Sequence, residues 1–299
     1  MDRMRHKLRL VPLVPRAFAA LLALTVAGCG NSAGNAGNAG DAGQNQGGAQ
    51  ATGGTGGQAG AEQAEACPAA PSTLAATGRV DIPVRVTSFQ TPMSIGVAAS
   101  GQAGREYKLS LLKFFFSQPE LVDAQGQASP AQFLGADGKP LPYGLALVDA
   151  DDQASQALHL AATPGTYVAL RFGVGVPAPC NHVSSTSQVF PLNPDSDMFW
   201  TWGSQFLFIR IEGNAKRAGA ESWEPFFYHL GYDAGFTPKT IPGTLAVGAS
   251  AASSSAPALI FDVDQLLKTD ALSLPPGDHS APDAFVLGNL KQQQTLRFE

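Results

Sequence analysis

Apolar and polar residues alternate along much of the chain beyond residue 67, with the two-residue period of a half-buried β-strand. The clearest case is residues 79–87, where valine and isoleucine occupy most alternate positions. Pro83 lies inside this run and favours a place at a sheet edge, because proline has no amide hydrogen to donate. Further strands are predicted at residues 107–117, 166–176, 205–211, 226–230 and 258–263.

Turns rather than long helices separate these predicted strands. Glycine, proline, asparagine and aspartate gather between them, as at 123–126, and only residues 264–268 have a helical pattern. The region 67–299 is long enough for one substantial core. The sequence therefore predicts one all-β domain, a β-sandwich or distorted barrel with long loops and little helix.

The first 28 residues have the organisation of a secretory signal peptide. Basic residues within 1–10 precede an apolar run whose uninterrupted part, 17–27, is shorter than the roughly 20 residues needed to span a bilayer. Small residues then lead into Cys29, a pattern that resembles a bacterial lipobox. We therefore expect Cys29 to be lipidated and to anchor the protein in the cell envelope, at the outer membrane or in the periplasm.

Residues 29–66 have the composition of a disordered tether. Twelve of the 33 glycines in the chain lie between positions 30 and 60, among alanine, glutamine and asparagine. Without large aliphatic or aromatic residues, this stretch cannot bury enough apolar surface to offset the entropy lost on ordering. We expect it to let the folded domain stand away from the membrane.

The mature chain is predicted to be acidic. Removal of residues 1–28 leaves 14 basic residues against 23 acidic ones, a net charge of −9. Nucleic-acid binding requires clustered lysine and arginine to neutralise phosphates, so this charge argues against a nucleic-acid partner.

Two cysteines remain in the folded region, Cys67 and Cys180. In an oxidising compartment they are candidates for a disulfide that ties the start of the domain to its central loop. Free or metal-binding thiols are the alternative.

A long segment without strand periodicity lies between the predicted strands that end at Val176 and begin at Gln205. It carries His182, Met198, Trp200 and Trp202, and so holds two of the three tryptophans of the chain. Loops of more than about 12–15 residues inside a compact domain are usually functional or disordered, and this aromatic content argues against disorder. The candidate site is therefore expected here.

An ordered set of short motifs resembles the MbnP-like copper-binding proteins. The motifs lie at residues 112–117, 121–123, 170–177, 181–182, 191–193, 198–202, 206–210 and 227–231. The resemblance implies a periplasmic β-sandwich that binds copper. It also implies a partner, a di-haem cytochrome c peroxidase-like enzyme that oxidises a tryptophan of the copper protein to kynurenine.

The resemblance places the metal site on particular residues of this chain. The family's Asn-His element falls on His182, its aromatic element on Trp200 and Trp202, and its His-Leu-Gly element on His229. Met198 is a further possible ligand. Imidazole and thioether are suitable copper ligands, and kynurenine would add an amine and a carbonyl that indole lacks.

The chain also departs from the family pattern. Many relatives have cysteines after the His-Leu-Gly element, whereas residues 231–235 contain none and Cys180 lies next to the Asn-His pair instead. The ligand set therefore stays open. Each histidine has an alternative role as a core or surface residue, the tryptophans have one as a packed lid, and Met198 has one as a core residue.

The motifs of common enzyme classes are missing from the sequence. It has no Gly-x-Ser-x-Gly elbow, His-Glu-x-x-His helix, Walker loop or dinucleotide fingerprint. A Cys180–His182 nucleophile lacks an evident orienting group. We expect a non-enzymatic protein that stores or delivers copper. The alternative is an envelope adhesion or glycan-binding lipoprotein whose tryptophans stack on sugars without a metal.

Overall fold

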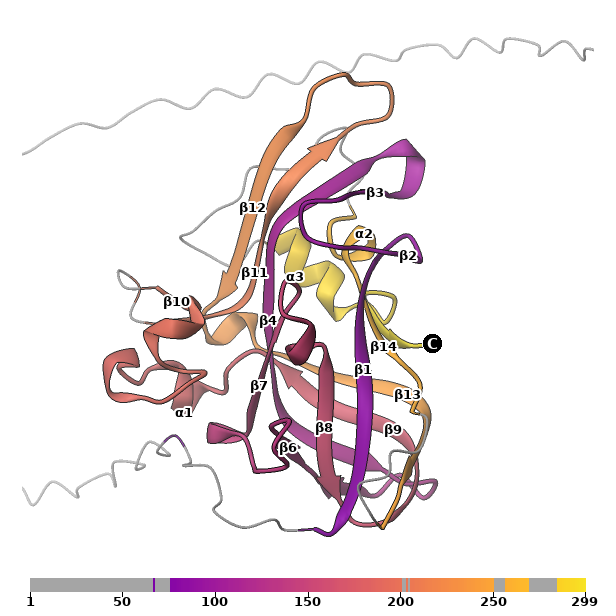
Figure 1. Ribbon diagram of the computed structural model, residues 1–299, viewed down its shortest axis with the longest axis vertical. Helices are drawn as coiled ribbons and strands as arrows, with labels where there is room; N and C mark the ends of the chain where they lie inside the picture. Colours follow the sequence, from indigo (N-terminus) through magenta and orange to yellow (C-terminus); the bar gives the residue numbers. More distant parts are fainter. Residues whose placement is uncertain (1–66, 68–75, 201–202, 204, 250–255, 269–283) are drawn as a thin grey trace, which may run out of the picture. The chain divides into compact units, whose positions relative to one another are not determined.

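The computed structural model describes residues 67, 76–200, 203, 205–249, 256–268 and 284–299, all within the compact unit Gly60–Glu299. The described strands form two separate β-sheets rather than one closed barrel (Figure 1). The all-β prediction is therefore confirmed, in its sandwich form. The predicted signal peptide, Cys29 and the predicted tether lie outside the described residues. Cys67, the predicted start of the domain, is described.

The first sheet has six strands. In spatial order they are β15 (Leu296–Phe298), β14 (Leu259–Asp262), β1 (Gly78–Ser88), β8 (Ala157–Ala162) and β6 (Gln132–Leu134), and the short β2 (Thr91–Pro92) also pairs with β1. The β1 strand matches the predicted run 79–87. Its first half is antiparallel to β8, and its second half is parallel to β14.

The expectation that Pro83 marks a sheet edge is wrong, because β1 lies between β8 and β14. The proline is tolerated because it occupies the point where β1 changes partners. The ladder to β8 ends at Pro83, and the ladder to β14 begins at Val84. A residue without an amide hydrogen therefore interrupts neither ladder in its middle.

The second sheet has nine strands. Its main order is β10 (Phe199–Trp200), β11 (Gln205–Lys216), β4 (Glu106–Val122), β9 (Gly165–Val174) and β13 (Thr237–Val247), with β12 (Glu224–Gly231) paired to β11, and with β3 (Ala98–Ser100), β5 (Ala128–Pro130) and β7 (Leu145–Asp149) paired to β4. The β4 strand extends the predicted run 107–117 through Pro119, with an irregularity between Ser117 and Glu120.

The main core lies between the two sheets. Val80, Ile82, Val84 and Val86 of β1 are all at most 6% exposed, as their alternation predicts. From the other sheet, this core receives the side chains of Phe114, Phe116, Ile209 and Ile211. The rings of Phe114 and Phe261 stack at 4.3 Å across the core. Full burial of such a side chain stabilises the fold by about 1.5–3 kcal/mol.

Helices are short in this domain. They are α1 (Ala178–Asn181), α2 (Val263–Leu266) and α3 (Ala284–Lys291), with 3₁₀ turns η1 (Gln102–Gly104), η2 (Pro142–Gly144), η3 (Gln153–Ser155), η4 (Ser185–Ser187), η5 (Pro194–Ser196) and η6 (Asp233–Gly235). Among the residues that the structure describes, no helix is long and apolar enough to cross a membrane.

The expectation of helix at 264–268 alone is wrong, because α1 and α3 are also helical. Tertiary contacts stabilise α3. Its Val286 and Leu290 are buried, and the buried ammonium of Lys239 on β13 donates hydrogen bonds of 2.9–3.2 Å to the carbonyl oxygens of residues 290–292. A cation at the carboxyl end of a helix complements its dipole.

Candidate functional site

A second apolar cluster underlies residues 177–200, here called the covering segment. The segment contains α1, η4, η5 and β10 and lies on the left-hand side of Figure 1. The buried residues of this second apolar cluster are separate from the main core. They are Phe115, Leu145, Val176, Cys180, Leu192, Met198, Trp200, Phe206, Leu207 and Phe208. Residues 177–200 of the predicted irregular segment are thus packed against the domain.

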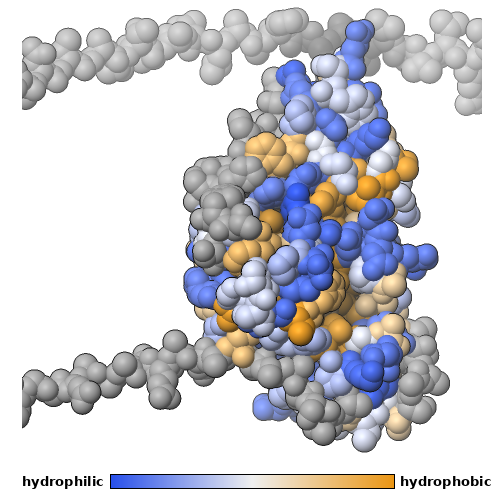
Figure 2. Space-filling view, turned by 60° about the vertical axis from the view of Figure 1, so that its left-hand side comes forward, coloured by the Kyte–Doolittle hydropathy of each residue, from blue (hydrophilic) through white to orange (hydrophobic). Residues whose placement is uncertain are grey.

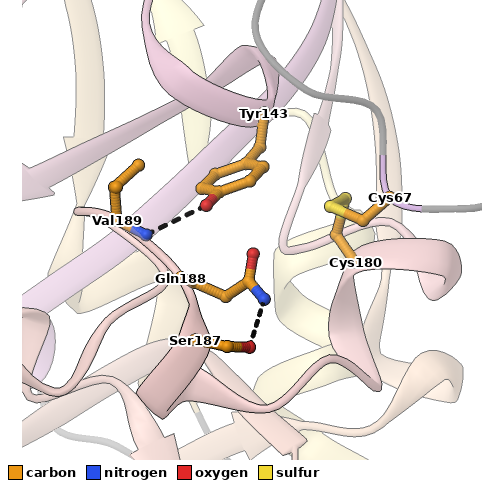
Figure 3. The surroundings of a disulfide bond; sticks show 6 residues. All are labelled: Cys67, Tyr143, Cys180, Ser187, Gln188 and Val189. Atoms are coloured by element: carbon orange, nitrogen blue, oxygen red, sulfur yellow. Dashed lines mark hydrogen bonds between the residues drawn. A yellow bond between two sulfur atoms is a disulfide. The ribbon is translucent and has the colours of Figure 1, made fainter.

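A disulfide fixes the beginning of the covering segment. Cys67 and Cys180 are bonded, as the sequence suggested, with an S–S distance of 2.03 Å (Figure 3). Farther along, the backbone amide of Val189 donates a hydrogen bond of 3.0 Å to the hydroxyl of Tyr143 in η2. The segment is therefore held to the domain covalently at one point and by a polar contact at another.

Asp233 of η6 joins the two residues of the Asn-His element. Its Oδ1 accepts a hydrogen bond of 2.8 Å from Nδ2 of Asn181, and its Oδ2 lies 2.9 Å from Nε2 of His182. Asn181 is fully buried, and its Oδ1 accepts a hydrogen bond of 2.9 Å from the amide of Phe206. Burial alone would raise the pKa of Asp233, but the contacts with Asn181 and His182 outweigh burial and lower that pKa.

A row of polar side chains crosses four strands of the nine-stranded sheet. Strand pairing places Lys113 of β4 opposite both Asp149 of β7 and Arg210 of β11, and Arg210 is opposite His229 of β12. Directly opposed residues project to the same face of a sheet. The row contains an ion pair of 3.2 Å between Lys113 and Asp149.

Glu212 connects two members of this row. Its Oε1 accepts a hydrogen bond of 2.8 Å from Nε of Arg210 and lies 2.8 Å from Nε2 of His229. Burial alone would raise the pKa of Glu212, but the contacts with Arg210 and His229 outweigh burial and lower it. The carboxylate form is therefore favoured next to both groups.

The polar row also holds the end of the covering segment. Arg210 donates a hydrogen bond of 3.0 Å to the carbonyl oxygen of Asp197 and pairs with the carboxylate of the same residue. Lys113 donates to the carbonyl oxygen of Ser196 at 3.3 Å. Because Ser196 and Asp197 are held in this way, the residues directly after them in the chain, including Met198 and Trp200, lie on the sheet.

Trp200 lies against the His229 end of the row. It is 5% exposed, and its ring is 6.4 Å from that of His229 and 5.3 Å from that of Tyr232, measured between centroids. Met198 is fully buried in the second apolar cluster, in agreement with its alternative role as a core residue. Trp202 lies outside the described residues.

A cleft of about 580 Å³ opens beside His182. Its lining combines the start and the end of the covering segment: His182, Val183, Ser184, Ser185, Thr186, Pro194, Asp197 and Phe199. Figure 2 turns this side of the domain toward the viewer and shows hydrophilic and hydrophobic side chains interspersed on it. The cleft is accessible to a small ligand or ion.

The predicted ligands fall into two separate groups. His229 lies with Trp200, whereas His182 lies against Asp233, which follows β12 closely in the chain. Among the described residues, no group of three or more His, Cys, Asp or Glu side chains is arranged to hold a metal. Imidazole is a suitable ligand for copper, but the described side chains do not by themselves form a complete metal site.

Sequence reasoning missed Asp233, Glu212 and Arg210. Asp233 follows the His-Leu-Gly element after one intervening residue, and Glu212 and Arg210 alternate with apolar residues on β11, so their face could be predicted from the sequence. Which histidine each carboxylate contacts depends on strand pairing and on the path of the covering segment.

These features define an all-β, two-sheet protein whose covering segment contributes the histidine of one histidine–carboxylate pair and places Trp200 against the histidine of a second pair. A comparison with protein-family models assigns residues 77–280 to MbnP, and the chain therefore belongs to the MbnP family. Among solved structures, it is similar to MbnP from Methylosinus trichosporium, with 19% identity over 68% of this chain and 82% of that chain and a TM-score of 0.48. A search of curated proteins gave no match.

Proposed function

We propose that this protein binds copper in the cell envelope and stores it or passes it to another carrier, without being an enzyme. Membership of the MbnP family supports the proposal. The observation that supports it best is the contact between His229 and Trp200, at 6.4 Å between ring centroids, because an imidazole, which is a suitable copper ligand, lies next to an oxidisable indole.

The proposed site uses His182 and His229 as nitrogen ligands, with an oxidised Trp200 or Trp202 as a further donor. Kynurenine has an aromatic amine and a carbonyl, whereas the indole of tryptophan is only a hydrogen-bond donor. Kynurenine would therefore supply an aromatic amine and a carbonyl oxygen, which histidine and carboxylate side chains lack. Met198 is no longer needed as a ligand in this proposal, because it is fully buried among apolar side chains.

Oxidation of the tryptophan is proposed to be the work of a di-haem cytochrome c peroxidase-like partner. Trp200 is nearly buried, and the cleft beside the covering segment does not include it among its lining residues. A separate enzyme that removes electrons over a distance is compatible with this burial, because it does not require contact with the indole. In this step the partner takes up four electrons, water supplies the oxygen atoms and the protons that are released, and the lost indole carbon leaves as formate.

Burial of Trp200 also weakens the alternative function. Glycan recognition by stacking needs an exposed ring face, and Trp200 is 5% exposed. The alternative would therefore have to rest on Trp202 or on other residues.

The experiment is to purify the protein from cells with and without the di-haem partner and to measure copper content and peptide masses. We expect copper close to one equivalent. In the presence of the partner, one tryptophan peptide should have lost one carbon and gained one oxygen, the change from tryptophan to kynurenine. Unaltered copper affinity after His182→Ala and His229→Ala together would overturn the ligand assignment, with His159→Ala as the matched control.

The membrane anchor is proposed separately, on the lipobox-like sequence before Cys29. The wild-type protein should partition with membranes, and Cys29→Ser should release it into the soluble envelope fraction. Soluble wild-type protein would contradict the anchor without affecting the copper proposal.

A further inference from the structure

Three histidines of the described domain contact carboxylates, and they do so through different ring nitrogens. Nε2 of His182 lies 2.9 Å from Oδ2 of Asp233, and Nε2 of His229 lies 2.8 Å from Oε1 of Glu212. His159 instead uses Nδ1, which lies 2.6 Å from Asp81.

The two Nε2 contacts are both in the candidate site, whereas the Nδ1 contact is in the other sheet. His159 and Asp81 are directly opposed on β8 and β1 of the six-stranded sheet. The third pair is therefore an ordinary cross-strand contact of the same chemistry, and it shows that a carboxylate does not by itself select Nε2.

We propose that Asp233 and Glu212 are positioning residues for the copper ligands, each holding the hydrogen on Nε2 of its histidine so that Nδ1 binds the metal. This inference rests on the proposed function. A neutral imidazole carries its hydrogen on one nitrogen and a lone pair on the other, so a carboxylate that accepts from Nε2 leaves the lone pair on Nδ1. Such carboxylate–histidine–metal arrangements orient the ring and fix its tautomer.

Each proposed positioning carboxylate is itself held in place. Asp233 accepts a second hydrogen bond from Asn181, which is fully buried and also bonded to the backbone of β11. Glu212 accepts a second one from Arg210. A carboxylate fixed by a second donor restricts the ring that it contacts, which a mobile surface ion pair would not do.

For His182, the geometry leaves Nδ1 available. Among the described residues, its only hydrogen bond is the one between Nε2 and Asp233, and the side chain borders the open cleft. Half of the His182 side chain is exposed, at 53%, so an ion can approach it from solvent.

The first test needs no metal. Long-range ¹H–¹⁵N correlation spectra of the metal-free protein report which ring nitrogen carries hydrogen at a pH where the histidines are neutral. We expect Nε2–H at His182 and His229 and Nδ1–H at His159. Nδ1–H at His182 or His229, or a fast mixture of tautomers there, would overturn the inference.

The second test compares Asp233→Asn with Asp81→Asn as a matched control. An asparagine at 233 offers one acceptor oxygen to two donors, so the Nε2–H signal of His182 should weaken and copper affinity should fall by about 10–100-fold. Asp81→Asn should change the His159 signal alone, and Asp233→Glu should restore part of the affinity. Equal affinities of Asp233→Asn and wild type would overturn the inference.

The two proposals fail in different ways. If the wild-type protein binds no copper, the proposed function is wrong, and the tautomer spectra still decide whether the carboxylates position the rings. If copper binds with high affinity and Asp233→Asn has no effect, copper binding survives and the positioning role is lost. Thermal melting of both variants checks that each is folded.

Discussion

The main core and the covering segment are ordered by different interactions. In the main core, alternating apolar residues of two sheets pack against one another, and rings such as Phe114 and Phe261 stack. In the covering segment, regular strand pairing is limited to β10, and a disulfide and polar contacts act beside the packing of the second apolar cluster. Because the two apolar clusters are distinct, we expect that the candidate site can be loosened without loss of the sandwich, and the variants below test this.

Phe114→Ala should have the largest effect, because it removes a fully buried ring from the main core. We expect a loss of about 3–5 kcal/mol in the free energy of unfolding. Urea denaturation followed by far-ultraviolet circular dichroism measures this loss. A change below about 1 kcal/mol would show that the main core does not dominate stability.

Replacement of both Cys67 and Cys180 by alanine should have the next largest effect. Loss of a native disulfide typically costs about 2–5 kcal/mol. Unlike Phe114→Ala, this variant should lose hydrogen-exchange protection first in the covering segment, while the amides of β1 and β8 remain protected. Simultaneous loss in both regions would show that they unfold as one unit.

Lys239→Met tests how α3 is attached to the sandwich. The ammonium donates to three carbonyl oxygens at the end of α3, and its removal should cost about 2–3 kcal/mol because those oxygens lose a charged donor. Hydrogen exchange should increase in α3 rather than in the covering segment. Lys291→Met, at an exposed position, is the control and should change stability by less than about 0.5 kcal/mol.

Asn181→Ala tests the polar contacts of the covering segment. It removes the donor to Asp233 and the acceptor for the amide of Phe206, so we expect a loss of about 1–3 kcal/mol. Tryptophan fluorescence should change before circular dichroism during denaturation. If the two signals change together, the segment does not unfold separately.

Acidification should produce the smallest effect. The pKa values of Asp233 and Glu212 are lowered in the folded protein, so each carboxylate stabilises the fold above its unfolded pKa, and this contribution is lost as the pH falls through the folded pKa. Protection of the covering segment should therefore decrease below about pH 4. Asp233→Asn should flatten this pH dependence, and an unchanged pH profile would contradict the assigned contacts.

The strands of the sandwich could be predicted from the sequence, but their partners could not. Alternation along β1 and the apolar runs of β4, β9 and β11 predicted the sandwich, because a period of two is a local property of a half-buried strand. Partner choice is not local. The parallel pairing of β1 with β14, which accommodates Pro83 inside the sheet, joins distant parts of the chain.

The candidate site was predicted only in part, for the same physical reason. Aromatic residues within a long irregular segment indicated where to look, and the cysteines indicated a disulfide. The pairing of His182 with Asp233 and of His229 with Glu212 requires the path of the covering segment and the register of β11 with β12. Neither the path nor the register can be predicted from local pattern.

The most direct test of the copper proposal is X-ray absorption at the copper edge, on protein isolated with its di-haem partner and loaded with one equivalent of metal. The account predicts imidazole scattering from two histidines, reduced in His182→Ala and in His229→Ala and unchanged in His159→Ala. Copper without imidazole scattering, or the same spectrum in all three variants, would contradict the account.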